Sequence, residues 1–165
     1  MSLTTFNPLT ALAIAPLVSS TCTFWYAFDQ NYFLSIFTTH PDDKFEKAIP
    51  DYFTRFFTAG LPRVLGILGT TCLSVAGNYV YRYDSLVASQ SLKWYLAGAA
   101  LAVSHLSFTP LVLPHIQRLQ GKNGICHIPK YVLSEWLYWH NIRSYTVDLA
   151  AWVCFAVAVG SNVAA

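Results

Sequence analysis

Four long apolar stretches constrain the fold of this chain more than any other feature of its sequence. No Asp, Glu, Lys or Arg occurs before Asp29, and none occurs in residues 64–81 or 94–117. A helix satisfies its own backbone hydrogen bonds in lipid, and about 20 apolar residues cross roughly 30 Å of hydrocarbon. The alternating pattern of a barrel strand is absent from the sequence. We therefore expect transmembrane helices.

The expected helices span approximately residues 9–28, 56–80, 94–114 and 131–163. They predict an all-α fold, an integral membrane four-helix transmembrane bundle that forms one domain over residues 1–165. The composition agrees, because 55% of the residues are hydrophobic and 11% are charged, whereas soluble chains are about 25% charged. The near-neutral net charge of +2 argues against electrostatic binding of nucleic acid.

Basic residues indicate how the helices are oriented in the membrane. The segments 29–55 and 115–130 hold most of the Lys and Arg residues, whereas the opposite side has only Arg82 and Lys93. By the positive-inside rule, we expect loops 29–55 and 115–130 to face the cytoplasm and both termini to face the lumen or the exterior. The endoplasmic reticulum or a related endomembrane is the expected location. The aromatic stretch 45–57 is expected to lie in the interface before the second helix.

Polar residues inside the third and fourth helices are candidates for chemistry. His105 lies near the middle of the membrane, where an ionisable group is costly and usually marks a function or a specific partner. His140 and Arg143 are three residues apart on one helical face, one turn after Trp136. Asp148 is five residues beyond Arg143, which is off its face in an α-helix. We therefore expect a different helix to supply the partner of Asp148.

Each of these residues also has a structural interpretation. His105 could be a neutral imidazole that bonds a neighbouring helix, and Arg143 could reach toward the lipid headgroups. Cys126 and His127 are adjacent, but no second pair accompanies them at zinc spacing. No nucleotide-binding motif is present in the sequence either. We therefore expect neither a metal nor a bound cofactor.

Two segments of the chain resemble a known family. Leu113-Pro114-His115 after Ser107-Phe108-Thr109 is similar to a signature at the end of the third helix, and Leu119 completes it. The last helix matches a Trp-x3-(Asn/His)-x2-Arg pattern through Trp136, His140 and Arg143. The chain thus resembles small four-helix membrane proteins related to the anthrone oxygenases of fungal aromatic polyketide pathways. Ser107 stands where that family usually has proline.

The resemblance implies a cofactor-independent monooxygenase of secondary metabolism, with molecular oxygen as co-substrate. Deprotonation of a phenol-bearing methylene gives an enolate that can pass an electron to oxygen. The resemblance assigns the base to His140 or His105 and the stabilisation of the anion to Arg143. Residues expected to contact the flat, lipophilic substrate are Trp136, Trp139, Thr109, His115 and Asp148.

Two alternatives remain open at this stage. The same residues could catalyse a cofactor-free cyclisation or isomerisation of a lipophilic intermediate, because a histidine and an aspartate can move protons to and from carbon. The chain could also be a non-catalytic four-helix accessory protein or a small transporter whose polar groups only hold helices together. If the chain is an enzyme, its expected partners are a lipophilic small-molecule substrate and the bilayer. The sequence leaves the oligomeric state undetermined.

Overall fold

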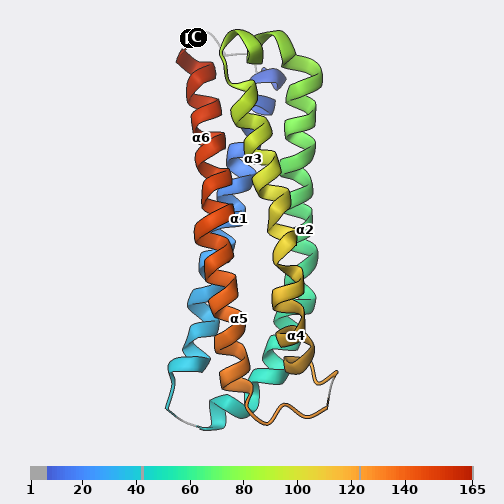
Figure 1. The fold of residues 1–165 in the computed structure, drawn as a ribbon, viewed down its shortest axis with the longest axis vertical. Coiled ribbons are helices and arrows are strands. Elements are labelled where there is room, and N and C mark those ends of the chain that lie inside the picture. The colour runs from blue at the N-terminus through green and yellow to red at the C-terminus, as the bar shows by residue number, and fades with distance from the viewer. Residues whose placement is uncertain (1–6, 42, 123, 165) are drawn as a thin grey trace, which may run out of the picture.

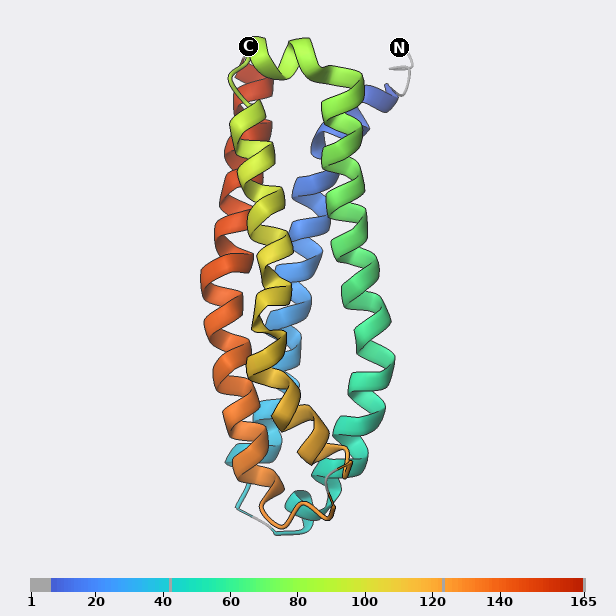
Figure 2. The same ribbon diagram turned by 45° about the vertical axis from the view of Figure 1, so that its right-hand side comes forward.

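The computed structural model describes residues 7–41, 43–122 and 124–164, and these residues form an all-helical bundle without strands. Four long helices within them are long and apolar enough to cross a membrane, which confirms the predicted fold class. Figures 1 and 2 show them side by side, alternating in direction. The first two are α1 (Pro8–Thr39) and α2 (Asp43–Ala88). The third comprises α3 (Leu92–Ser104), η1 (His105–Phe108) and α4 (Thr109–Leu119), and the fourth comprises α5 (Pro129–Arg143), η2 (Ser144–Asp148) and α6 (Leu149–Ala164).

Local sequence explains where the first helix begins and ends. Asn7 caps α1, because its side-chain oxygen accepts a hydrogen bond from the Leu9 N–H at 2.9 Å. Pro8 follows at the first helical position, where its missing N–H costs nothing. At the other end, His40 adopts an extended backbone, with φ −70° and ψ 134°, as a residue before proline prefers.

Two apolar clusters hold the bundle together at different heights. One lies toward the α1–α2 connection and joins α1, α2, α4 and α5 around the fully buried Phe53 and Leu133. The other lies toward the α2–α3 connection and joins α2, α3 and α6 around Tyr95 and Phe155. Figure 2 shows α2 and α6 on opposite sides of the bundle. Between the two clusters lie the polar residues that the sequence analysis singled out.

The helices extend well beyond the segments expected from hydropathy. Residues 29–55 are not a loop, because α1 continues to Thr39 and α2 already begins at Asp43. The stretch 45–57 likewise belongs to α2 and is continuous with the second long helix. The physical reason is packing: Leu34 and Phe53, which lie in these extensions, are fully buried in the first cluster. Segment 115–130 is also partly helical, since α4 ends only at Leu119.

Close packing of α3 against α6 leads to a first prediction. A Cβ atom added to Gly98 would lie only 2.7 Å from Cε1 of Phe155, whose side chain is fully buried. Overpacking of this kind costs about 1–3 kcal/mol, so we expect Gly98→Ala to lower the thermal unfolding midpoint in detergent. Gly66→Ala is the matched control, because no atom lies within 4 Å of the added Cβ. Equal midpoints for the two variants would contradict this packing.

Candidate active site

A π-helical turn in the fourth long helix brings together two charged side chains that an α-helix would separate. The turn η2 spans Ser144–Asp148, and its i→i+5 hydrogen bonding places residues five apart on one face. Nε of Arg143 consequently donates to Oδ2 of Asp148 at 3.3 Å. The expectation that Arg143 lies off the face of Asp148 is therefore wrong, because it assumed an uninterrupted α-helix.

Asp148 also bonds a residue of another helix, as its sequence position predicted. Nδ1 of His105, the first residue of η1, lies 2.9 Å from Oδ1 of Asp148. Because a carboxylate can only accept, Nδ1 carries the hydrogen of this bond. Asp148 is 4% exposed, and the two partners leave each of its oxygens with a charged or polar donor. A buried carboxylate needs such partners.

His140 has both ring nitrogens engaged in hydrogen bonds. Nε2 donates to the backbone carbonyl of Ala27 on α1 at 2.9 Å. Nδ1 then has to accept, and it does so from Nη2 of Arg143 at 3.1 Å. Trp136 stacks on the same imidazole, with 4.8 Å between ring centroids. His140 thus positions Arg143. The hydrogen bonds form one buried chain, which runs from His105 to Asp148, then to Arg143 and His140, and ends at Ala27 on α1.

His105 differs from His140 in having one ring nitrogen without a partner. Its Nδ1 is bonded to Asp148, whereas no hydrogen bond reaches its Nε2 from any residue of the described chain. With the hydrogen held on Nδ1, the neutral ring carries its lone pair on Nε2. His105 lines a cavity, so this nitrogen is the part of the network best placed to meet a ligand.

The cavity next to this network has a volume of about 270 Å³ and a mainly apolar wall. Residues from α1, α2, η1, α4 and α5 line it. Phe56, Phe57 and Val112 contribute apolar surface, whereas His105 and Arg143 bring the polar network to the wall. A mostly apolar pocket with a few convergent polar groups is the usual form of a small-molecule site.

Leucine side chains at the rim connect the cavity with the outer surface of the bundle. Leu61 and Leu65 of α2 line it from one side, and Leu106 and Leu113 line it from the third long helix. All four are 42–47% exposed. The rim therefore lies between α2 and the third long helix, on the side surface of the bundle. In a membrane that surface would face the acyl chains.

The structure separates the expected binding residues into two groups. Trp136 and Thr109 line the cavity, and Asp148 lies behind His105 in a smaller adjoining pocket. Trp139 and His115 are outside the cavity lining; Trp139 packs edge-on against Tyr138 instead. Trp139 and His115 therefore do not reach the cavity that Trp136 and Thr109 line.

Sequence reasoning missed several residues of the cavity wall, among them Gln30 and Gly60. Gln30 of α1 lines the cavity although it lies in the segment expected to be a loop, and Gly60 of α2 faces it. The signal for Gln30 was the helical continuation of α1 as far as the buried Leu34. Gly60 gave no sequence signal, because its role depends on Tyr26 of another helix, whose hydroxyl would lie 3.1 Å from an added Cβ.

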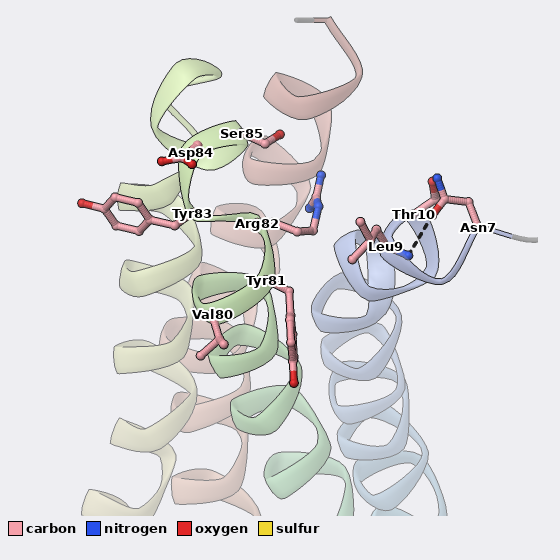
Figure 3. A pocket seen from close by; sticks show the side chains of 9 residues that line it. All are labelled: Asn7, Leu9, Thr10, Val80, Tyr81, Arg82, Tyr83, Asp84 and Ser85. Carbon is pink, nitrogen blue, oxygen red and sulfur yellow. Dashed lines mark hydrogen bonds between the residues drawn. The ribbon is translucent and has the colours of Figure 1, made fainter.

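A second cavity, of about 410 Å³, lies at the opposite end of the bundle between the start of α1 and the end of α2. Figure 3 shows its side chains spread along these helix ends and not converging on one point. Its cation, Arg82, already donates to Asn78 at 2.8 Å and to Asn162 at 3.2 Å. None of the network residues lines this cavity. Arg82 therefore joins the ends of α2 and α6. The cavity beside it is not the candidate site.

The fold and the site together define a small helical protein of membrane-spanning type, with a buried ionic network against an apolar cavity. Over 168 aligned residues, the chain is 30% identical to epoxidase gkaX of Penicillium citrinum. This similarity covers 98% of the chain and 99% of that protein. The chain therefore belongs to the family of this epoxidase, a family of fungal secondary-metabolism proteins.

A further relative is the oxaleimides biosynthesis cluster protein N of Penicillium oxalicum, which is 27% identical over 150 residues. The similarity covers 88% of the chain and 85% of that protein. No family model matches the chain, and no solved structure matches it. The predicted link with fungal secondary metabolism is confirmed, whereas the resemblance to anthrone oxygenases remains a prediction.

Proposed function

We propose that the chain is a membrane-embedded oxidative enzyme that acts on a lipophilic intermediate of fungal secondary metabolism. The observation that carries this proposal is the unpartnered Nε2 of His105 on the wall of an apolar cavity, with Asp148 bonded to the opposite ring nitrogen. The relative named epoxidase supports the oxidative class. The biosynthesis cluster protein supports the metabolic setting.

His105 is the proposed general base. A carboxylate on Nδ1 holds the imidazole in the tautomer whose Nε2 can take a proton, and it stabilises the imidazolium that forms. Asp148 stands in that position, 2.9 Å from Nδ1. His140 is the less suitable candidate, because a substrate proton could reach its ring only after the bond to Ala27 or to Arg143 had broken.

Arg143 is proposed to stabilise the anion that deprotonation creates. Its guanidinium lines the cavity and is held in place by Asp148 and His140. A cation fixed in advance, in a site that excludes water, stabilises developing negative charge more strongly than a mobile one in water. Base and cation thus act on the same bound molecule.

The finer proposal is a reaction with molecular oxygen and no bound cofactor. Loss of a proton from an activated, phenol-bearing methylene gives an enolate that can transfer an electron to O₂. In the overall reaction the CH₂ group and one O₂ become a carbonyl group and one water. The protein has to supply a base, a fixed cation and a dry cavity. The resemblance of the last helix to anthrone oxygenases supports this choice of substrate class.

The proposed setting is the endoplasmic reticulum or a related endomembrane, with residues 1–165 forming one transmembrane domain. The short α1–α2 and α4–α5 connections would face the cytoplasm, in accordance with the basic residues near them. The partners of the protein would then be the bilayer and a lipophilic substrate. The leucine-lined rim between α2 and the third long helix supports entry of that substrate from the bilayer.

Oxygen uptake with a cavity-filling variant tests the proposed function. Purified protein in nanodiscs would receive anthrone, without added metal or flavin, and ¹⁸O₂ would show whether oxygen enters the product. We expect catalysed uptake that Val64→Phe reduces at least tenfold, because Val64 lines the cavity and the larger ring occupies substrate space. Leu73→Phe is the control on the same helix, since Leu73 is 74% exposed. Equal rates for both variants would place the reaction elsewhere.

The His105–Asp148 pair also favours a second candidate, a cofactor-free cyclase or isomerase. An imidazole held by a carboxylate can deliver and remove protons at carbon without any oxidant. Such an enzyme would convert its substrate without consuming oxygen. Conversion of a lipophilic intermediate under nitrogen at the same rate as in air would therefore favour this candidate over the oxidative one.

A further inference from the structure

We propose that Gln30 binds the polar end of the ligand and that the ligand therefore carries a carbonyl-type oxygen on an otherwise apolar skeleton. The inference rests on the proposed function in so far as the ligand is the substrate. Gln30 lies on α1, within the part of the helix that faces the cavity. Neither the fold nor the ionic network requires its carboxamide.

The carboxamide of Gln30 is open to the cavity and has no hydrogen-bond partner among the described residues. The residue is only 8% exposed, and no hydrogen bond joins its side chain to any other residue in the described part of the chain. Its nitrogen and oxygen are accessible from the cavity and are not enclosed by protein atoms. A polar group on an otherwise apolar cavity wall needs a hydrogen-bond partner within the cavity. A ligand that hydrogen-bonds this group in the cavity would supply one.

Gln30 shares the cavity wall with the two groups proposed to act on the substrate. His105 and Arg143 line the same cavity. One turn earlier on α1, the carbonyl of Ala27 bonds His140, which in turn positions Arg143. The same helix segment therefore fixes both Gln30 and the guanidinium. A ligand held by Gln30 would be held at a set position relative to the base and the cation.

Gly60 on the facing helix keeps this side of the cavity open. A Cβ atom there would lie 3.9 Å from Nε2 of Gln30 and 3.1 Å from the hydroxyl oxygen of Tyr26. Any larger side chain would therefore extend toward the carboxamide. The absence of a side chain at Gly60 leaves room for a ligand atom beside Gln30.

The chemistry of the wall defines the ligand class. The carboxamide of Gln30 has its N–H groups available, and its Nε2 lies on the Gly60 side of the cavity. Such a group favours a neutral acceptor, for which a carbonyl oxygen has the right geometry. Phe56, Phe57 and Val112 leave the rest of the ligand in apolar surroundings. The ligand is therefore a carbonyl-bearing, predominantly apolar molecule.

A pair of probes that differ only in the carbonyl tests this inference. Equilibrium dialysis against protein-loaded and empty nanodiscs would measure the dissociation constants of anthrone and of dihydroanthracene, which has the same rings without the carbonyl. We expect wild-type protein to bind anthrone about three- to tenfold more tightly, the usual net value of one hydrogen bond. Gln30→Leu should reduce this ratio to about one. Gln30→Met serves as a second variant should the first fail to fold.

Asn31→Leu is the matched control for these measurements. Asn31 is the next residue of α1 but lines a different, much smaller pocket beside Asn141 and Tyr145, so the variant should keep the wild-type ratio. An unchanged ratio in the Gln30 variants, or no preference for anthrone in wild-type protein, would overturn the inference. Carbonyl preference without oxygen uptake would leave the inference standing and overturn the proposed function. Oxygen uptake without Gln30-dependent preference would do the reverse.

Discussion

Asp148→Asn is expected to destabilise the protein by about 3–5 kcal/mol, because it leaves Arg143 as a buried cation without its counter-ion. The carboxylate accepts from Arg143 through one oxygen and from His105 through the other. An asparagine of the same shape keeps only one acceptor oxygen. Its amide nitrogen would face a donor, either the guanidinium or the imidazole N–H. One of the two bonds is therefore lost and replaced by repulsion.

Thermal and denaturant unfolding in detergent would measure this effect. Asp51→Asn is the matched control, because Asp51 also pairs with an arginine, Arg55, at 3.2 Å, but both side chains are more than three-quarters exposed. Exposed pairs contribute about 0–1 kcal/mol, so this variant should unfold close to wild type. If the two variants had the same free energy of unfolding, Asp148 would not be the buried counter-ion of Arg143. The oxygen-uptake rate should also fall, because a neutral amide does not stabilise the imidazolium that forms at His105 as a carboxylate does.

The transmembrane-length helices were predictable from the sequence because their signal is local. Uninterrupted apolar stretches report how much of a helix lipid can cover. The same signal underestimated how far the helices extend, because Leu34 and Phe53 are covered by neighbouring helices and not by lipid. Hydropathy cannot distinguish these two ways of burying a residue. As a result Gln30, which lies in the extension of α1, was overlooked.

The sequence predicted which residues belong to the candidate site but not which of them bond to each other. Helical periodicity placed His105, His140 and Arg143 on interior faces, and all three are largely buried. The pairing of Arg143 with Asp148 was missed because it requires the π-helical turn at Ser144–Asp148. One extra residue in a turn changes which side chains share a face. No local sequence pattern predicted the π-helical turn. Turns of this kind often occur at functional sites.

The roles of the two histidines follow from contacts that lie far apart in the sequence. His140 is separated by more than a hundred residues from the carbonyl of Ala27 that binds it, and His105 is bound by Asp148 from another long helix. Both residues looked equally suited to act as a base when only their spacing was known. The distinction between them depends on which ring nitrogen remains without a partner, and only the packed bundle determines that.

His105→Asn is accordingly expected to lower the rate of oxygen uptake by about 10²–10⁴-fold, the usual contribution of a general base. Asparagine places an amide N–H near the position of Nδ1 of His105, so the buried carboxylate of Asp148 keeps a donor. Its amide, however, cannot accept a proton from the substrate at neutral pH. We therefore expect the unfolding midpoint to change little while the reaction is lost.

His140→Gln should show the opposite pattern. This side chain is 1% exposed, stacks on Trp136 and joins Ala27 to Arg143, so its replacement should lower stability more than His105→Asn does. The rate should fall less, because Arg143 retains its bond to Asp148. Both variants would be compared by oxygen uptake at saturating anthrone and by thermal unfolding in the same nanodiscs. If His140→Gln lost the reaction while His105→Asn kept it, the base would be His140, and its bonds to Ala27 and Arg143 would have to open during turnover.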